Sequence, residues 1–123
     1  MTTPTLVSVV DDDESVRESL PDLLRELGFE ARAFSSAEAF LASDCVGQTK
    51  CLILDILMPG MTGPGLQREL KRRGEVIPIV FITAHKDASD LSRVLQDGAV
   101  DCLFKPFSEK SLIKAINMAL KAD

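Results

Sequence analysis

The chain has 123 residues and a formal net charge of −5, with 46% hydrophobic and 27% charged residues. These values predict one globular domain, residues 1–123, with enough chain for a hydrophobic core. An acidic chain without clustered Lys and Arg is not expected to bind nucleic acid directly. No apolar run approaches the about 18 residues of a membrane span, and the start, MTTPTLVSVV, does not resemble a signal peptide. We therefore expect a cytoplasmic protein that makes no contact with membranes.

The first quarter of the chain predicts a strand followed by a helix. Residues 5–10 are apolar and rich in Val, which favours a strand. Leucines and a valine then recur at helical spacing: Val16, Leu20, Leu23, Leu24 and Leu27. Gly28 is the expected end of this helix. Pro21 lies inside it, removes one backbone hydrogen bond, and is expected to kink the helix at a cost of about 3 kcal/mol.

The next segment predicts a second strand, a short helix and a third strand. Residues 29–34 alternate in polarity and predict the second strand. The pattern Ser35-x-x-Glu38 is typical of a capping box and predicts a short helix over the apolar residues that follow. A polar loop over residues 44–50 precedes the third strand, residues 52–54, which ends at Asp55.

The second half continues the same alternation. Pro64 fits the first turn of a helix that ends near Gly74, and residues 78–82 predict a fourth strand. Asp87 is expected to cap a helix that ends at Gly98, and residues 100–104 predict a fifth strand. Ser108 is expected to cap a last helix with a regular apolar face: Leu112, Ile113, Ile116, Ala119 and Leu120.

Five strands that alternate with five helices predict an α/β fold, in which right-handed crossovers give a parallel sheet covered on both faces. The nearly continuous apolar strands agree, because strands of such a sheet are buried on both sides. Ligands of these sheets bind beyond the carboxyl ends of the strands. The function is therefore expected at that edge.

Polar residues follow the strands at the edge where the ligand is expected. Asp11 and Asp12 follow the first strand, Asp55 ends the third, Thr83 follows the fourth and Lys105 follows the fifth. Each also fits a structural purpose: acidic residues cap helices, a threonine ends a strand, and a lysine lies in a solvated turn. It is their conjunction at one edge that predicts a site.

Carboxylates brought together repel one another unless a cation lies between them. Mg²⁺ takes one or two carboxylates and shares phosphate oxygens, so it suits this set of ligands. Lys105 has no lone pair to give a metal and is expected to contact an anion, to which Thr83 can donate a hydrogen bond. An Asp side chain can accept a phosphoryl group covalently. The pattern therefore predicts a magnesium-dependent phosphoryl acceptor.

Four motifs give the chain a resemblance to bacterial response-regulator receiver domains over essentially its whole length. They are VVDDDE, LDILMPGMTG, FITA and GAVDCLFKPF. The last of these, together with SSAEAFL, most resembles the nitrogen-fixation-regulator subgroup. The resemblance implies the flavodoxin-like strand order 2-1-3-4-5.

The resemblance also implies which residues bind the metal and the phosphoryl group. Asp55 matches the aspartate that a histidine kinase phosphorylates. Asp12 matches the direct Mg²⁺ ligand, Asp11 the ligand that acts through water, and Leu57 the position whose backbone carbonyl completes the metal site. Asp13 and Glu14 have no such match and are expected to be charges at the start of a helix.

The remaining two matches concern the phosphoryl group itself. Thr83 corresponds to the hydroxyl that moves toward the phosphoryl group, and Lys105 to the lysine that contacts it. The resemblance further implies a cis peptide bond between Lys105 and Pro106. His85 and Leu57 occupy positions that influence how fast the aspartyl phosphate hydrolyses, although a solvent-exposed loop is the simpler interpretation of His85.

Cys102 departs from the family pattern. Many relatives carry Tyr or Phe at this position, three residues before the lysine, and their ring turns inward after the threonine moves. This chain has no Tyr, so we expect its switch to use Thr83 and a rearrangement around residues 87–104. Three cysteines without C-x-x-C spacing predict reduced thiols rather than a disulfide, a zinc site or a redox sensor.

The expected function is a phosphorylation-controlled switch, not a conventional enzyme. Its expected partners are a sensor histidine kinase and, through phosphorylation, a second copy of the chain. A DNA-binding output domain usually follows such receivers, and none is expected within these 123 residues. The alternatives are an Mg²⁺-dependent phosphohydrolase, which would want an acid or base where Leu57 lies, and a flavin carrier, whose phosphate loop would not read DDDE.

Overall fold

In the computed structural model, which describes residues 4–84 and 88–121, five strands form one parallel sheet. They are β1 (Leu6–Val10), β2 (Glu30–Phe34), β3 (Cys51–Asp55), β4 (Ile79–Thr83) and β5 (Asp101–Phe104). Each predicted strand is confirmed to within one residue at either end. The order is β2-β1-β3-β4-β5 and every neighbouring pair is parallel, as the resemblance implied.

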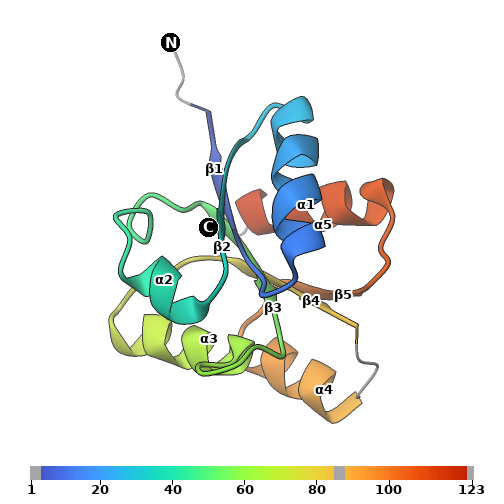
Figure 1. Cartoon of the computed structure of the whole chain (residues 1–123). Coiled ribbons are helices and arrows are strands. Elements are labelled where there is room, and N and C mark those ends of the chain that lie inside the picture. Colours follow the sequence, from blue (N-terminus) through green and yellow to red (C-terminus); the bar gives the residue numbers. More distant parts are fainter. Residues whose placement is uncertain (1–3, 85–87, 122–123) are drawn as a thin grey trace.

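Five helices of the described residues cover the two faces of this sheet (Figure 1). They are α1 (Glu14–Glu26), α2 (Ala37–Leu41), α3 (Gly63–Arg72), α4 (Ala88–Gln96) and α5 (Glu109–Lys121). Helices α1 and α5 lie on one face, and α2, α3 and α4 lie on the other. The predicted α/β class with helices on both faces is therefore confirmed. Within the described ranges, no helix is both long and apolar enough to cross a membrane.

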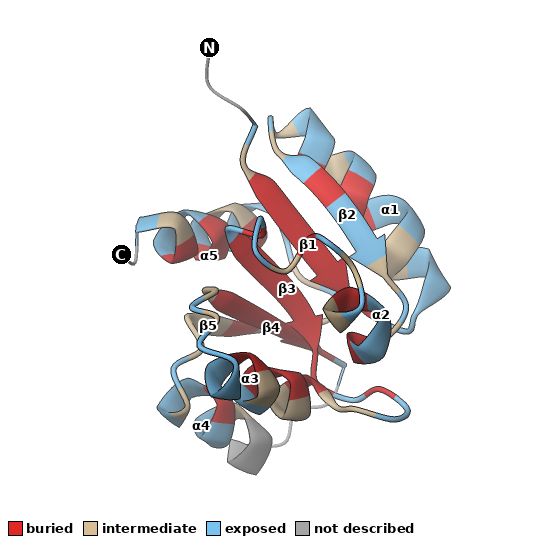
Figure 2. Ribbon diagram, turned by 90° about the vertical axis from the view of Figure 1, so that its left-hand side faces the viewer, coloured by how far each residue is buried: buried red, intermediate tan, exposed pale blue. Residues whose placement is uncertain are grey.

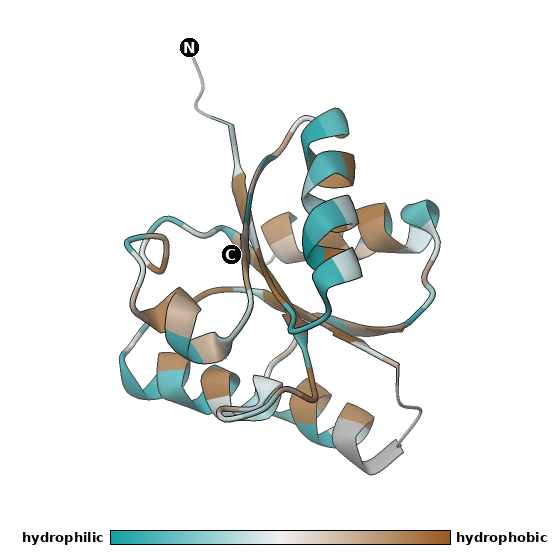
Figure 3. Ribbon diagram, in the orientation of Figure 1, coloured by the Kyte–Doolittle hydropathy of each residue, from teal (hydrophilic) through white to brown (hydrophobic). Residues whose placement is uncertain are grey.

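Two apolar cores lie on the two faces of the sheet. One packs Leu24 of α1 and Ile116 of α5 against alternate strand residues such as Val9. The other packs Phe40 of α2 and Leu66 of α3 against the opposite strand residues. Strands β1, β3 and β4 are buried along their whole length (Figure 2), and most of their residues are hydrophobic (Figure 3). Burial on both sides explains why these strands have almost continuous apolar sequences.

The register of the strands brings their carboxyl ends to one edge. Asp55 at the end of β3 lies beside Ile82, and Thr83 at the end of β4 lies beside Phe104. Asp11 follows directly after β1, the other neighbour of β3. Because all the strands run in the same direction, each of these polar residues appears at the same edge of the sheet.

Several predicted helix ends are confirmed. Asp13 is the N-cap of α1, and its carboxylate accepts hydrogen bonds from Ser15, which lower the pKa of Asp13. The Ser108 hydroxyl accepts the Ser111 N–H at the start of α5. Helix α1 continues through Pro21, which is buried, while its kink remains a prediction. The expected cap at Asp87 lies outside the described residues.

The predicted capping box at Ser35 is wrong by one residue. The N-cap of α2 is Ser36, whose hydroxyl accepts the N–H of Ala39 at 3.0 Å. Two adjacent serines precede the helix, and it is Ser36 whose extended backbone, with φ −153° and ψ 159°, directs its hydroxyl toward the helix N–H groups. Glu38 then lies two residues after the cap, so it cannot complete the reciprocal bond of a capping box.

The cysteines are buried free thiols, as predicted. Burial raises the pKa of Cys51 to about 12, and burial followed by the charge of Asp101 raises the pKa of Cys102 to about 11. A thiol with such a pKa stays protonated near neutral pH and is a poor nucleophile. Both residues therefore act as small apolar side chains of the core.

The corrected cap can be tested with two neighbouring substitutions. We expect Ser36→Ala to lower the free energy of unfolding by about 1 kcal/mol, because one N–H group of α2 loses its acceptor. The matched control Ser35→Ala should change it by less than about 0.5 kcal/mol. Urea unfolding followed by far-ultraviolet circular dichroism suits a chain that has no Trp or Tyr. Equal effects of the two substitutions would contradict the assignment of the cap.

Candidate functional site

The site lies at the carboxyl edge of the sheet, where β1, β3, β4 and β5 end. Asp11 is completely buried, and Asp55 and Thr83 are 6% and 2% exposed. Asp12 is exposed, and the Lys105 side chain is 19% exposed. The structure thus brings these predicted residues to one edge, with the acidic groups ranging from buried to open to solvent.

Three carboxylates converge there. Asp11, Asp12 and Asp55 each offer one carboxylate oxygen, and these oxygens all lie within 4.8 Å of one another. Like charges at this separation repel strongly, the more so because two of the three groups are buried. The cluster therefore needs compensating positive charge.

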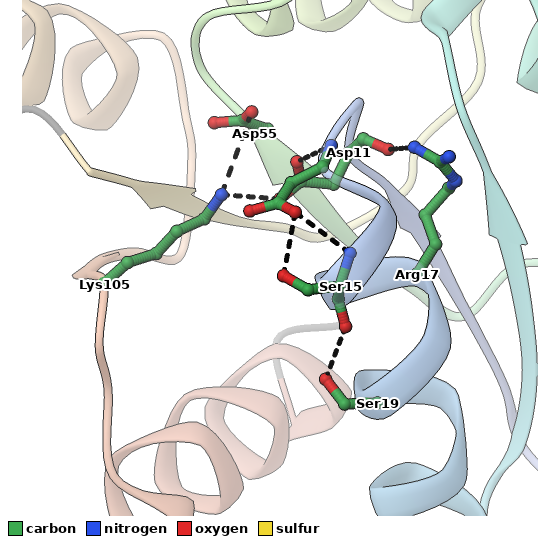
Figure 4. A network of polar contacts seen from close by, with 7 residues as sticks. Asp11, Ser15, Arg17, Ser19, Asp55 and Lys105 are labelled. Carbon is green, nitrogen blue, oxygen red and sulfur yellow. Dashed lines mark hydrogen bonds and ion pairs between the residues drawn. The ribbon is translucent and has the colours of Figure 1, made fainter.

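Part of that compensation comes from the groups around Asp11 (Figure 4). One carboxylate oxygen, Oδ1, accepts the N–H of Asp13 at 2.9 Å, and Oδ2 accepts Lys105 Nζ at 2.8 Å. The main-chain carbonyl of Asp11 accepts Arg17 Nη1 at 3.0 Å. Asp11 is therefore held rigidly from three sides, as a buried carboxylate must be.

Lys105 reaches both strand ends. Its Nζ lies 2.8 Å from Asp11 Oδ2 and 3.9 Å from Asp55 Oδ2, and Figure 4 shows it between the two carboxylates. Its backbone N–H donates to the carbonyl oxygen of Thr83 at 2.8 Å, which ties β5 to the end of β4. The Lys105–Pro106 peptide bond is cis, as the resemblance implied. The ammonium group thus lies where it can contact an anion attached to Asp55.

The surroundings of Asp55 strongly change the pKa of its carboxyl group. Burial and, after it, the negative charge of Asp11 raise the pKa of Asp55 to about 7, while Lys105 opposes the rise. One lysine does not neutralise three carboxylates. A divalent cation between them would favour the charged form of Asp55 and bring its pKa down.

The loop after Asp55 is closely packed beneath the site. The N–H of Gly63 donates to the carbonyl oxygen of Ile56, and Thr62 caps α3 by accepting the N–H of Gly65. A side chain at Gly63 would overlap the carbonyl oxygen of Asp55, so this position needs glycine. Leu57 lies within this loop and is 46% exposed, and its apolar side chain offers no ligand atom to the acidic cluster.

These residues fit a hard divalent cation. The cluster offers only oxygen ligands, from Asp55 at the end of β3 and from two residues that follow its neighbour β1, and it carries excess negative charge. Mg²⁺ is commonly held by one or two carboxylates together with water and phosphate oxygens. The acidic cluster is therefore able to bind a metal ion of this kind.

Sequence reasoning missed the contribution of Arg17. Its side chain reaches back from the fourth residue of α1 to the carbonyl of Asp11. Residues six apart do not contact each other along a regular helix. Asp11 precedes α1, so this bond depends on how the chain turns before the helix begins. In the sequence, the only feature that could have indicated this contact is a basic residue close to the acidic run DDDE.

Cys102 is 8% exposed and lies beside Phe81 in the ladder between β4 and β5. It belongs to the apolar core below α4 rather than to the acidic cluster. The position that carries an aromatic ring in many receivers is thus filled by a small buried thiol. His85 lies outside the described residues.

An acidic cluster that could hold a cation lies with a lysine at the carboxyl edge of this doubly wound sheet, which is the position where such sheets bind ligands. Residues 7–117 match the family described as "Response regulator receiver domain". The chain belongs to this family of phosphorylation-dependent signalling domains.

Comparisons with individual proteins support the assignment to this family. The chain is 45% identical over 119 residues to "Response regulator protein TmoT" of Ectopseudomonas mendocina, a match that covers 95% of this chain and 53% of that protein. Response regulator StyR has a solved structure with a TM-score of 0.89 and 47% identity, covering 97% of this chain and 60% of that one. The chain thus spans about half the length of TmoT.

The structure of FixJ-N matches with a TM-score of 0.88 and 36% identity, covering 99% of this chain and 98% of that one. This likeness confirms the predicted relation to the nitrogen-fixation-regulator subgroup.

Because the pKa of Asp55 is raised, replacing its carboxylate should stabilise the fold, and the gain should depend on pH. Native Asp55 keeps its proton up to about pH 7, whereas the unfolded chain loses it near the ordinary value of 3.8, so the wild type loses stability as the pH rises between them. In metal-free buffer we therefore compare the free energy of unfolding of Asp55→Asn with that of the wild type. The difference in favour of the variant should be larger by about 1–2 kcal/mol at about pH 8 than at about pH 5.

Urea unfolding at the two pH values measures this difference. The matched control is Glu26→Gln, which neutralises an exposed carboxylate at the end of α1. Its effect should not change with pH in the same way. An advantage of Asp55→Asn that stays constant from about pH 5 to about pH 8 would contradict a raised pKa.

Proposed function

We propose that residues 1–123 form a receiver domain in which Asp55 accepts a phosphoryl group from the phosphohistidine of a sensor kinase. One Asp55 oxygen attacks phosphorus, a P–O bond forms, the P–N bond breaks, and the imidazole leaves with the bonding electron pair. The observation that carries the proposal is the position of Asp55, which is nearly buried beside two further carboxylates and within 3.9 Å of Lys105.

Mg²⁺ is the metal we propose for the acidic cluster. Asp12 and Asp55 would bind it directly, Asp11 through water, and Leu57 through its backbone carbonyl. The ion would neutralise charge on the phosphoryl oxygens, which is the main contribution to such transfers. The three hydrogen bonds that hold Asp11 support this division, because they leave Asp12 as the freer ligand.

Lys105 and Thr83 would act on the phosphoryl group. Lys105 now pairs with Asp11 and lies close to Asp55, so a small movement would bring it to a phosphoryl oxygen. Thr83 lies at the end of the strand beside β3, and its hydroxyl would donate a hydrogen bond to the same group. Both residues would then report the phosphorylated state to β5 and α4.

The output would be a changed binding surface. Phosphorylation adds about two negative charges near neutral pH, and such a charge biases two existing conformations. By the likeness to "Transcriptional regulatory protein FixJ" of Azorhizobium caulinodans, which is 37% identical over 114 residues, this surface would control transcription in the cytoplasm through a part of the protein outside residues 1–123, and phosphorylation would favour a homodimer. The domain itself would not contact DNA or a membrane.

A phosphohydrolase on the same chemistry is the alternative, and Leu57 argues against it. That chemistry needs an acid or base near the aspartyl phosphate, and the half-exposed Leu57 side chain offers neither. Self-phosphorylation and self-dephosphorylation are the only reactions we propose.

Phosphorylation of Asp55 can be tested without the kinase. After incubation with acetyl phosphate and Mg²⁺, we expect the intact protein to gain the mass of one phosphoryl group, labile to hydroxylamine. Asp55→Asn should gain none, and a chelator should reduce the gain for the wild type by at least about tenfold. An equal gain in Asp55→Asn, or no gain in the wild type, would contradict the assignment.

The unusual Cys102 gives a second test. If the switch does not need an aromatic ring, Cys102→Ser should respond to phosphorylation like the wild type, whereas Thr83→Val should lose most of the response. Hydrogen exchange of α4 and β5, with and without acetyl phosphate, measures the response. A much larger change in the hydrogen exchange of α4 in Cys102→Tyr than in the wild type would instead show that the wild-type switch is incomplete.

A further inference from the structure

Glu38 has a contact that its sequence motif did not predict. Its carboxylate Oε2 accepts the backbone N–H of Met61 at 3.1 Å, across 23 residues of sequence. This bond joins the first turn of α2 to the loop that follows Asp55, residues 56–62. It is the point at which an exposed side chain of α2 touches the loop that carries the proposed carbonyl ligand.

The loop backbone lies directly against this carboxylate. Gly60 has a φ of 75°, and a Cβ built there would lie 2.7 Å from Glu38 Oε2. A side chain at Gly60 would meet both an unfavourable backbone conformation and the carboxylate itself. Glycine at this position therefore permits the close approach that the hydrogen bond from Met61 needs.

Other contacts hold the loop at its ends and through two methionine side chains. At one end Ile56 is bound by the N–H of Gly63, which lies against Asp55. In between, the Met58 side chain is buried in the same core as Phe40 of α2. Farther out, Pro59 and Gly60 are exposed, and Met61, whose side chain packs against that core, has its backbone N–H bound by Glu38.

We propose that Glu38 is a positioning residue for the metal site. Its bond to Met61 fixes the loop so that the Leu57 carbonyl keeps its place relative to Asp55. The inference rests on the proposed Mg²⁺ site and assigns to α2 a part in it. Glu38 contacts neither the metal nor the phosphoryl group and acts only through the loop.

Three substitutions of Glu38 distinguish the effect of its side-chain length from the effect of its charge. Glu38→Gln keeps an oxygen at the same distance but loses the charge, whereas Glu38→Asp keeps the charge but is too short to reach Met61. Glu38→Ala loses both. We expect Asp and Ala to weaken Mg²⁺ binding about threefold to tenfold, the usual effect of one lost hydrogen bond, and Gln to stay within about twofold of the wild type.

Two measurements test this expectation. Isothermal titration calorimetry with Mg²⁺ gives the affinities, and amide exchange of Met61 by nuclear magnetic resonance shows whether its N–H has lost its acceptor. Met61 should exchange faster in the Asp and Ala variants and stay protected in Gln. A thermal melt by circular dichroism confirms that each variant is folded.

The outcomes separate the inference from the proposed function. No Mg²⁺ binding by the wild type would contradict the proposed metal site. Normal wild-type binding with unchanged affinity in Asp and Ala would overturn only the part assigned to Glu38. An equal loss in Gln and Asp would overturn it as well, because charge rather than the hydrogen bond would then be responsible.

Discussion

The convergence of three carboxylates on one point is the constraint on which the rest of the structure depends. Parallel pairing of β1 with β3 brings Asp11 and Asp12 to Asp55. The repulsion among them is compensated by Lys105 and by the hydrogen bonds that hold Asp11. A site with so much negative charge is poised to respond to any added cation or phosphoryl group.

The fold holds this charge in place with two separate cores. Each face of the sheet packs its own set of helices, so the strand ends are fixed from both sides. Gly63 lets the loop pack directly under Asp55, and Lys105 ties β5 to the end of β4 through its backbone. Added charge at Asp55 would consequently be felt by β4, β5 and the loop together. This rigidity is what makes a local electrostatic change able to alter a distant surface.

The strands and the polar edge could be predicted because local features determine them. Apolar runs predicted four of the strands and alternating polarity predicted the second, and the positions of Asp55, Thr83 and Lys105 follow directly from where the apolar runs end. The strand order came only from the resemblance, since alternation of strands and helices permits several orders. Ser35 was chosen wrongly because the two adjacent serines have the same chemistry, and only the folded backbone shows that Ser36 caps the helix. The contacts of Arg17 and Glu38 depend on how loops fold back, which no local pattern encodes.

The central claim is that one divalent ion lies among these three carboxylates. A crystal structure with Mn²⁺, located by its anomalous scattering, tests it most directly, because Mn²⁺ accepts the same oxygen ligands as Mg²⁺. We predict an ion bound at about 2.0–2.3 Å by Asp12, Asp55 and the Leu57 carbonyl. An ion found elsewhere, with no density among the three carboxylates, would contradict the claim.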